Sequence, residues 1–393
     1  MKPIMSDDVV GACTPFTILD GRVLNPGSSG AGWWDDRCAA MPIVLPPTDT
    51  QDKWQCFYYG RPDASWNGGL PAFLPTGISG VAESVDGLNW CRVAGPLKGG
   101  AVLRPSDDPD AFDHIHLGLT DVTPLGGGSY SALYFGGSSE EVNLGMGPGP
   151  IKGFKMRPGA ATSRDGLVWE RTADSPLLDV GSVGSWDSNF CSWPRALPLD
   201  RSQPDGQWLM TYHALMPAGT DGVDAPRWAV GGALCEAGHA LGPWTKVDGP
   251  ILRGGVPGSF DEAGIGTRHV VHAPDGGDGL VMVYEGVGGD GRHRLGLATS
   301  VDGLSWSKVE GLGPDLGGPI FEGAPKDEDA WDNGNVGTPW VVALPSGGWR
   351  LYYVGTSDKG RAVAIGAAES DKLMSAEWRR VAVSKSGAVA DWS

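Results

Sequence analysis

A five-fold internal repeat is the feature of this sequence that most constrains its fold. Five segments begin with an aromatic residue followed by Asp, carry a small residue five positions later and then enter an apolar run. Consecutive segments lie roughly 70 to 80 residues apart, a period typical of proteins built from stacked supersecondary units. The shared aspartates are Asp35, Asp113, Asp187, Asp261 and Asp332.

Each unit carries two further repeated elements. A short apolar-aromatic run, typical of a β-strand, aligns one tyrosine per unit; the aligned tyrosines are Tyr58, Tyr134, Tyr212, Tyr284 and Tyr353. An S-x-D-G-L-x-W segment then begins at Ser84, Ser163 and Ser300, and its Asp-Gly pair predicts a tight hairpin turn. The other two units end in related segments at Trp244 and Trp378.

Five units of about four short strands predict an all-β fold, a five-bladed β-propeller with four-stranded antiparallel blades around a central axis. We expect a single domain over residues 1–393. The predicted blades cover about 32–104, 110–180, 185–254, 259–322 and 330–393. A further copy of the segment that connects the units begins at Arg22, so the N-terminal segment is expected to close the ring.

Charge and composition limit the classes of partner. The formal net charge is −17, which repels phosphate backbones and anionic membranes. We therefore expect a small-molecule or carbohydrate ligand rather than nucleic acid or a membrane, and the sequence predicts no oligomeric state. The 6 cysteines form no C-x-x-C pair and are expected to be buried, reduced thiols.

The N-terminal residues lack the apolar segment of a secretory signal, and no run reaches the length of a membrane span. A cytoplasmic location is the resulting expectation. A transit peptide removed before this sequence begins remains an alternative.

Two hairpin segments resemble a known group of enzymes. "LGLATSVDGLSWSKV" from Leu295 and "GAATSRDGLVWERT" from Gly159 are similar to repeats in the invertase, levansucrase and arabinanase superfamily of five-bladed propellers, which includes glycoside hydrolase families 32, 43, 68 and 130. The resemblance extends from about Arg22 to Trp378. It implies a glycan-processing ancestry. The superfamily's usual settings for its three catalytic carboxylates do not occur in this chain, so the resemblance places no catalytic residue.

Residues present in all five units are expected to stabilise the blades, because one active site does not require five copies of the same group. The shared aspartates are predicted to accept backbone N–H bonds in the turns that enter the inner strands. Asp86, Asp165 and Asp302 are predicted to be hairpin residues. Chemistry is therefore expected where one unit departs from the others.

Several units carry a polar residue at a repeat position where other units do not. Because these positions are equivalent, the polar side chains are expected to converge in one axial funnel. The candidate catalytic carboxylates are Asp121 and Glu285, with Asp36 and Glu262 as candidates at the rim. The candidate substrate-binding residues are His114, His116, Trp193, Arg195, His213, Arg268, His269 and Trp340. Packing between blades is the alternative role for the two tryptophans.

Glycoside cleavage requires two carboxyl groups at a defined separation, one of which often has a raised pKa. Asp121 lies near an Arg/His-rich layer, so we expect it to keep its charge and act as base or nucleophile. Glu285 has apolar neighbours in "VYEGV", which favour a raised pKa and the role of acid.

The histidines also raise the possibility of a metal site. His114 and His116 share one face of a strand, and with His213 or His269 they would suit a divalent ion. Hydrogen bonding to substrate hydroxyls is the favoured interpretation, and no metal or cofactor is predicted. Two insertions, from Arg61 and from Gly137, are predicted to form a lid over the funnel or to be surface decoration.

The sequence thus favours a glycoside hydrolase-like enzyme that acts on a glycan or glycoside through paired carboxylates in the axial funnel. The alternative is a propeller that binds a sugar or small metabolite without hydrolysis, or an enzyme of another reaction class that uses the Arg/His ring.

Overall fold

The computed structural model of the chain describes residues 20–28, 30–49, 51–61, 77–144, 149–220, 224–236, 240–274, 279–310, 312, 318–357 and 363–382. These residues form strands and turns, with a 3₁₀ turn, η3 (Lys98–Gly100), and no α-helix. None of the described segments forms a helix with the length and apolar character that crossing a bilayer requires.

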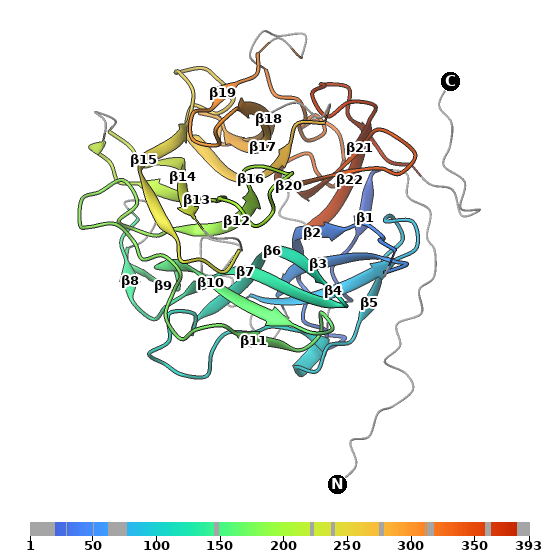
Figure 1. Cartoon of the computed structure of the whole chain (residues 1–393). Coiled ribbons are helices and arrows are strands. Elements are labelled where there is room, and N and C mark those ends of the chain that lie inside the picture. The colour runs from blue at the N-terminus through green and yellow to red at the C-terminus, as the bar shows by residue number, and fades with distance from the viewer. Residues whose placement is uncertain are drawn as a thin grey trace.

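Five antiparallel blades surround a central axis, as Figure 1 shows, which confirms the predicted five-bladed β-propeller. The first blade contains β2 (Cys38–Leu45), β3 (Trp54–Arg61), β4 (Ile78–Ser84) and β5 (Cys91–Val93). The second contains β6 (His116–Gly126), β7 (Ser129–Gly137), β10 (Met156–Ser163) and β11 (Trp169–Arg171), with a small hairpin, β8 (Glu141–Val142) and β9 (Ile151–Lys152), inserted after β7.

The remaining blades follow the same order. The third contains β12 (Ser192–Pro198), β13 (Trp208–Met216), β14 (Arg227–Cys235) and β15 (Thr245–Arg253). The fourth contains β16 (Gly264–His272), β17 (Leu280–Val287), β18 (His293–Ser300) and β19 (Ser307–Lys308). The fifth contains β20 (Asn335–Ala343), β21 (Trp349–Thr356), β22 (Ala364–Ser370) and β23 (Arg379–Arg380).

The first and last described strands, β1 (Arg22–Leu24) and β23, both pair antiparallel with β22 in the fifth blade. The indole Nε1 of Trp340 in the fifth blade donates a hydrogen bond of 2.8 Å to the carbonyl of Val44 in the first. The first and fifth blades therefore contact each other directly.

The repeated Asp, Tyr and far-end Trp mark one stabilising cluster per blade. In the first blade the Tyr58 hydroxyl donates to Asp35 at 2.8 Å, and Arg92, two residues after Trp90, forms an ion pair with the same carboxylate at 2.7 Å. The corresponding ion pairs are Arg171–Asp113, Lys246–Asp187, Lys308–Asp261 and Arg380–Asp332. The aspartates do have a structural role, but their partners in these clusters are side chains and not the backbone N–H groups that the sequence predicted.

The Asp-Gly hairpins also have the predicted structural role. Asp86 Oδ1 accepts from the backbone N–H of Leu88 and of Asn89, each at 2.8 Å. Gly87 adopts a φ of 73°, a left-handed conformation that the turn requires and that glycine adopts without strain. Asp165 and Asp302 repeat this arrangement in their own blades.

Most of the described cysteines match the expectation of buried thiols: Cys38, Cys56, Cys191 and Cys235. Cys91 differs, because it is disulfide-bonded. Cys13 lies outside the described residues.

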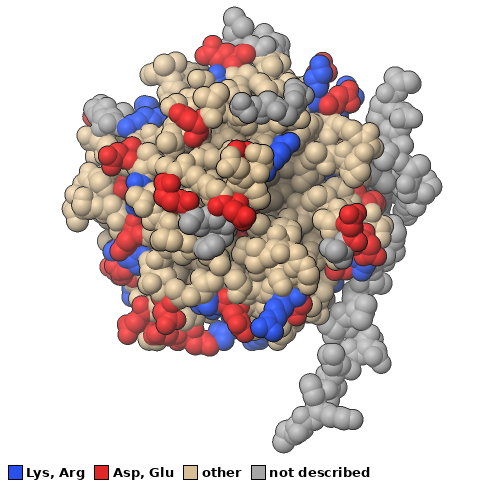
Figure 2. All heavy atoms as spheres, in the orientation of Figure 1, with Lys and Arg blue, Asp and Glu red and all other residues tan. Residues whose placement is uncertain are grey.

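The described residues on the face drawn in Figure 2 form no single acidic patch. Acidic side chains are scattered there among neutral and basic ones.

Candidate functional site

Two separate cavities lie along the inner strands. The larger, which we call the axial cavity, has a volume of about 450 Å³ and is lined by the first halves of the inner strands β2, β12, β16 and β20. The smaller, which we call the second cavity, has a volume of about 190 Å³ and is lined by later residues of β6, β12, β16 and β20. The described residues therefore do not form the single funnel expected from the sequence.

A β-bulge interrupts every inner strand at the height of the axial cavity. The register shifts occur between Ala40/Ile43, Leu119/Asp121, Ser192/Arg195, Ile265/Arg268 and Gly337/Trp340. Met41, Trp193 and Thr338 stand at the same bulge position and have φ values of 56°, 56° and 46°. All three line the axial cavity. Left-handed backbone at residues other than glycine is strained and is concentrated at functional sites, where bulges re-aim side chains.

Glu285 on β17 is the carboxylate of the axial cavity. One oxygen lies 2.5 Å from Nδ1 of His293; the other accepts from the Thr267 hydroxyl and, at 3.0 Å, from the backbone N–H of Thr338. Burial raises the pKa of Glu285, but the hydrogen bond and charge of His293, together with Thr267 and Thr338, hold that pKa below its usual value. The raised pKa expected from the apolar sequence neighbours is therefore wrong.

His293, at the start of β18, completes this pair. Burial lowers its pKa, but the hydrogen bond and charge of Glu285 outweigh burial, so the pKa of His293 is raised above its ordinary value. An ionised carboxylate only accepts hydrogen bonds, so Nδ1 of His293 carries a proton and Nε2 is the atom whose protonation changes. The side chain is 35% exposed, and His293 lines the axial cavity.

His213 lies in the wall of the same cavity but cannot carry charge there. Burial lowers its pKa to about 3, and the Arg268 guanidinium acts in the same direction, so the imidazole is neutral at ordinary pH. Its Nδ1 is buried and has no hydrogen-bond partner among the described atoms. The ring is 5.3 Å from the rings of both Trp193 and Trp228.

The insertion of the second blade forms part of the cavity wall. Leu144, Ile151, Phe154 and Met156 all line the cavity. His116 binds the carbonyl of Gly153 through Nε2 at 2.5 Å, so this predicted substrate-binding residue holds the insertion in place. The other predicted insertion, after Arg61, lies outside the described residues as far as residue 76.

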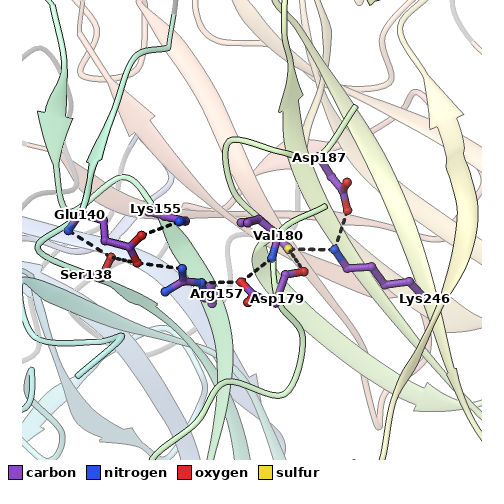
Figure 3. Close-up of polar contacts among 9 residues, drawn as sticks. Ser138, Glu140, Lys155, Arg157, Asp179, Val180, Asp187 and Lys246 are labelled. Carbon is purple, nitrogen blue, oxygen red and sulfur yellow. Dashed lines mark hydrogen bonds and ion pairs between the residues drawn. The ribbon is translucent and has the colours of Figure 1, made fainter. Parts of the chain in front are cut away.

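A chain of ion pairs fixes the outer side of this insertion, as Figure 3 shows. Glu140 pairs with Lys155 at 2.5 Å and with Arg157 at 2.8 Å, and Arg157 also pairs with Asp179 at 2.8 Å. Lys155 lies between the cavity-lining residues Phe154 and Met156 in the chain. The contacts therefore anchor the backbone that carries the apolar wall.

Two arginines occupy the core beneath the bulges. Arg195 donates to the carbonyls of Thr120, Arg268 and Pro339 at 3.0, 2.5 and 2.8 Å. Arg268 donates to Thr211 Oγ1 at 3.0 Å and to the carbonyls of Thr211 and Trp193. Both side chains are buried and satisfy backbone carbonyls, so their main contacts tie inner strands together.

The second cavity contains Asp121, Arg195, His269 and Trp340. Asp121 and Glu285 thus line different cavities, and the structure does not bring the predicted carboxylate pair together. Burial raises the pKa of Asp121 to about 6, although the Ala196 N–H and the Arg195 charge act to lower it. The expectation that Asp121 is the carboxylate that keeps its charge, with Glu285 as the acid, is therefore wrong, because the pKa of Asp121 is raised and that of Glu285 is lowered.

Three of the candidate site residues directly follow a shared aspartate, and each binds the loop that precedes it. Asp36 accepts from the backbone N–H of Gly32 at 2.9 Å and of Trp33 at 3.2 Å. Glu262 accepts from the N–H of Gly258, and His114 Nδ1 lies 2.9 Å from the carbonyl of Ser106. None of the three lines either cavity, so the structure gives them a role in the turns.

Neither candidate tryptophan presents an open face for a sugar. Trp193 is 4% exposed, and its ring stacks on Phe135 at 4.9 Å. Trp340 is 5% exposed, stacks on His269 at 3.9 Å and lies beneath the Arg195 guanidinium. These contacts agree with packing between blades, the alternative considered for both.

His293 is not among the residues predicted from the sequence, because it lies on a third strand and the repeat positions were compared only on the inner and second strands. The strand register places a glycine opposite each shared tyrosine, at Gly80, Gly159, Gly231, Gly296 and Gly366. Three residues before these glycines stand Gly77, Met156, Trp228, His293 and Val363. Met156, Trp228, His293 and Val363 all line the axial cavity. Comparison of this position across the third strands would have identified His293 as the one ionisable residue among apolar ones.

No three His, Cys, Asp or Glu side chains gather closely enough to hold a metal ion within the described part of the chain. Glu285 and His293 form a pair without a third such ligand, and His114 and His116 are each bound to a backbone carbonyl.

Comparison with known proteins identifies the fold. No protein-family model matches the chain, and no curated protein matches its sequence. A structure described as belonging to the family 130 mannoside phosphorylases and glycoside hydrolases superposes with a TM-score of 0.60 at 17% identity, over 91% of this chain and 95% of the other. A glycosyl hydrolase from Bacteroides ovatus gives 0.59 at 15% identity, over 91% and 95%.

A third similar structure is that of an enzyme named for deacetylation and not for glycoside cleavage. The N-acetylgalactosamine deacetylase from F. plautii, solved with blood group B trisaccharide, has a TM-score of 0.58 at 15% identity, over 91% of this chain and 96% of the other. Structures of one fold thus include both glycosidases and a deacetylase, so the fold does not define the reaction. The chain shares the five-bladed β-propeller fold of these structures.

Proposed function

We propose that this chain is a carbohydrate-active enzyme that performs general acid–base chemistry in the axial cavity, with His293 as the group that transfers the proton. The observation that carries the proposal is the Glu285–His293 pair, 2.5 Å apart, inside a cavity of about 450 Å³. The similarity of the fold to glycoside hydrolases and to a sugar deacetylase supports a carbohydrate-bearing substrate.

Each partner has a distinct task in this proposal. Glu285 fixes the orientation and tautomer of His293 and stabilises its protonated form, as a carboxylate does for a catalytic histidine. Nε2 of His293 then takes a proton from a substrate hydroxyl or a water molecule, or gives one to a leaving oxygen. The raised pKa of His293 favours its protonated form over that of a free imidazole.

The geometry favours this arrangement over cleavage by two carboxylates. Among the described residues that line the axial cavity, Glu285 is the one carboxylate, and Asp121 lies in the second cavity. A glycosidase with the usual mechanism needs a second carboxyl group about 5 to 9.5 Å away across the substrate. Hydrolysis of an acyl substituent on a sugar uses an acid–base group, a water molecule as nucleophile and hydrogen-bond donors to the developing oxyanion, and it needs no second carboxylate.

A second candidate function is ligand binding without turnover. The bonds to Glu285 from His293, Thr267 and Thr338 satisfy both carboxylate oxygens, an arrangement equally suited to a fixed binding group. The same experiment separates the two functions.

The test is a turnover screen of the wild-type protein with p-nitrophenyl glycosides and with acetylated sugars. We expect measurable turnover for at least one probe and a loss of about 100- to 10,000-fold in kcat/KM for His293→Gln, the range typical of removing a general acid–base group. His272→Gln is the matched control, because His272 lies on β16 outside both cavities. Absence of turnover across the panel, with binding retained, favours the binding function. Turnover that survives His293→Gln contradicts the proposed role.

A further inference from the structure

The axial cavity has two chemically different sides. Its charged and most of its polar side chains come from the fourth and fifth blades: Thr267, Glu285, His293, Asn335, Thr338 and Thr356. The wall from the first three blades is apolar and, among the described lining residues, contains no Asp, Glu, Lys or Arg. Its histidine, His213, is neutral at ordinary pH because burial lowers its pKa to about 3.

The apolar side is a poor surface for a bare sugar. A sugar carries hydroxyls around its whole ring, and each hydroxyl buried without a partner loses hydrogen bonds to water. The wall from the second-blade insertion is made of Leu144, Ile151, Phe154 and Met156, which offer aliphatic and aromatic surface. The Trp193 ring is covered by Phe135 and is not available for stacking on a sugar.

Unpaired polar atoms occur on both sides of the cavity, and among the described atoms the one on the polar side belongs to Thr338. The Thr338 hydroxyl is buried without a partner among the described atoms, although its own backbone N–H binds Glu285. Nε1 of Trp193 is likewise unpaired in the opposite wall. Buried polar groups are nearly always hydrogen-bonded, so both atoms are suited to contact a ligand. Thr338 and Trp193 also have the left-handed backbone of the bulges.

From this asymmetry we infer that the ligand of the axial cavity is amphipathic: a glycoside or sugar ester with an apolar body, such as an alkyl, aryl or isoprenoid group. The apolar body lies against the second-blade insertion, and the polar group to be transformed lies at His293 and Thr338. This inference rests on the proposed function for the identity of the polar part, whereas the apolar preference depends only on the cavity wall.

The experiment measures the binding of methyl, butyl and hexyl β-glucosides, glucose and hexanol to the full chain by isothermal titration calorimetry. Each methylene that enters an apolar site improves affinity by roughly fourfold. We expect the Kd of hexyl glucoside to be at least tenfold below that of methyl glucoside, with detectable binding of hexanol. Equal Kd values along the series, or no binding of any member, overturns the inference.

Two variants test whether the alkyl chain binds against the wall formed by the second-blade insertion. Leu144→Trp fills the cavity and is expected to weaken hexyl glucoside binding at least tenfold while changing methyl glucoside binding little. Leu125→Trp is the matched control, because Leu125 is 57% exposed and outside the cavity. If Leu144→Trp does not fold, the wild-type series still decides the inference. A Kd series unchanged in folded Leu144→Trp contradicts the assignment to this wall.

The same measurements distinguish this inference from the proposed function. A chain-length preference that persists in His293→Gln, in a protein with no turnover, leaves the inference intact and removes the enzymatic role. If the protein turns over bare sugars and an apolar chain does not improve affinity, the proposed enzymatic function is supported and the inferred amphipathic ligand is contradicted.

Discussion

Gly337 and the carboxylate of Glu285 occupy adjoining space in the axial cavity. A Cβ atom at residue 337 would lie 2.6 Å from the Glu285 carboxyl carbon, closer than atoms can approach, so the absence of a side chain is what allows Glu285 its position. The bulge that follows Gly337 then directs the N–H of Thr338 at the same carboxylate.

Gly337→Ala is therefore expected to displace Glu285, break its bond to His293 and reduce turnover or ligand binding at least tenfold, with a stability loss of about 1 to 3 kcal/mol from overpacking. Gly266→Ala is the matched control, because a Cβ there lies 3.6 Å from the same carboxyl carbon, an ordinary contact. Chemical denaturation and the binding assay measure both effects. Equal behaviour of the two variants contradicts the close packing at Gly337.

Glu285→Gln tests the electrostatic coupling in the pair. The variant removes the negative charge that raises the pKa of His293, so that pKa should fall toward or below its ordinary value of 6.5. NMR titration of the imidazole in both proteins measures the shift directly. An unchanged His293 pKa contradicts the coupling.

The same pair predicts how stability depends on pH. The pKa of Glu285 is lowered in the folded state from 4.5, so its contribution is present above 4.5 and is lost as the pH falls through the lower folded value. The pKa of His293 is raised, so its contribution is present below 6.5 and is lost as the pH rises through the higher folded value. Urea unfolding of wild type and Glu285→Gln across these two windows should differ, and parallel curves would contradict the prediction.

Asp121→Asn is expected to increase stability at neutral pH. Because burial raises the pKa of Asp121 from 3.8 to about 6, the folded state is fully favoured below 3.8 and loses stability as the pH rises to about 6. A shift of this size corresponds to a gain of the order of 1 to 3 kcal/mol in the variant at pH 7. Unfolding free energies at pH 4 and pH 7 measure it, and activity in the axial cavity should be unchanged. A less stable variant at pH 7 would show that the charged form is needed for the bond from Ala196.

Asp35→Asn tests the repeated blade cluster. Burial raises the pKa of Asp35 despite the pull of Arg92. Neutralising Asp35 nevertheless leaves Arg92 without this ion pair, so the variant should lose about 3 to 5 kcal/mol. Asp107→Asn is the control, because the side chain of Asp107 is 82% exposed in its pair with Arg104 and solvent screens that interaction, so little loss is expected. Thermal and urea unfolding compare the two. Similar losses in both variants contradict a special role for the buried cluster.

The sequence by itself determined the architecture. The aromatic-Asp segments, the aligned tyrosines and the Asp-Gly hairpins are local patterns repeated five times, and each blade forms the same contacts from them. The structural role of Asp35 and Asp86 followed from that repetition, because a residue needed once cannot explain five copies.

Only the tertiary structure decided which of the departing residues share a site. Asp121 and Glu285 depart from the repeat equally, but Asp121 follows the bulge of its inner strand and Glu285 lies level with the bulges, so the two line different cavities. The pKa directions were also inaccessible from the sequence. They depend on His293, Thr267 and Thr338, which approach Glu285 from a third strand, a bulge and a neighbouring blade. Contacts across blades set these properties, and the order of residues along one strand does not encode them.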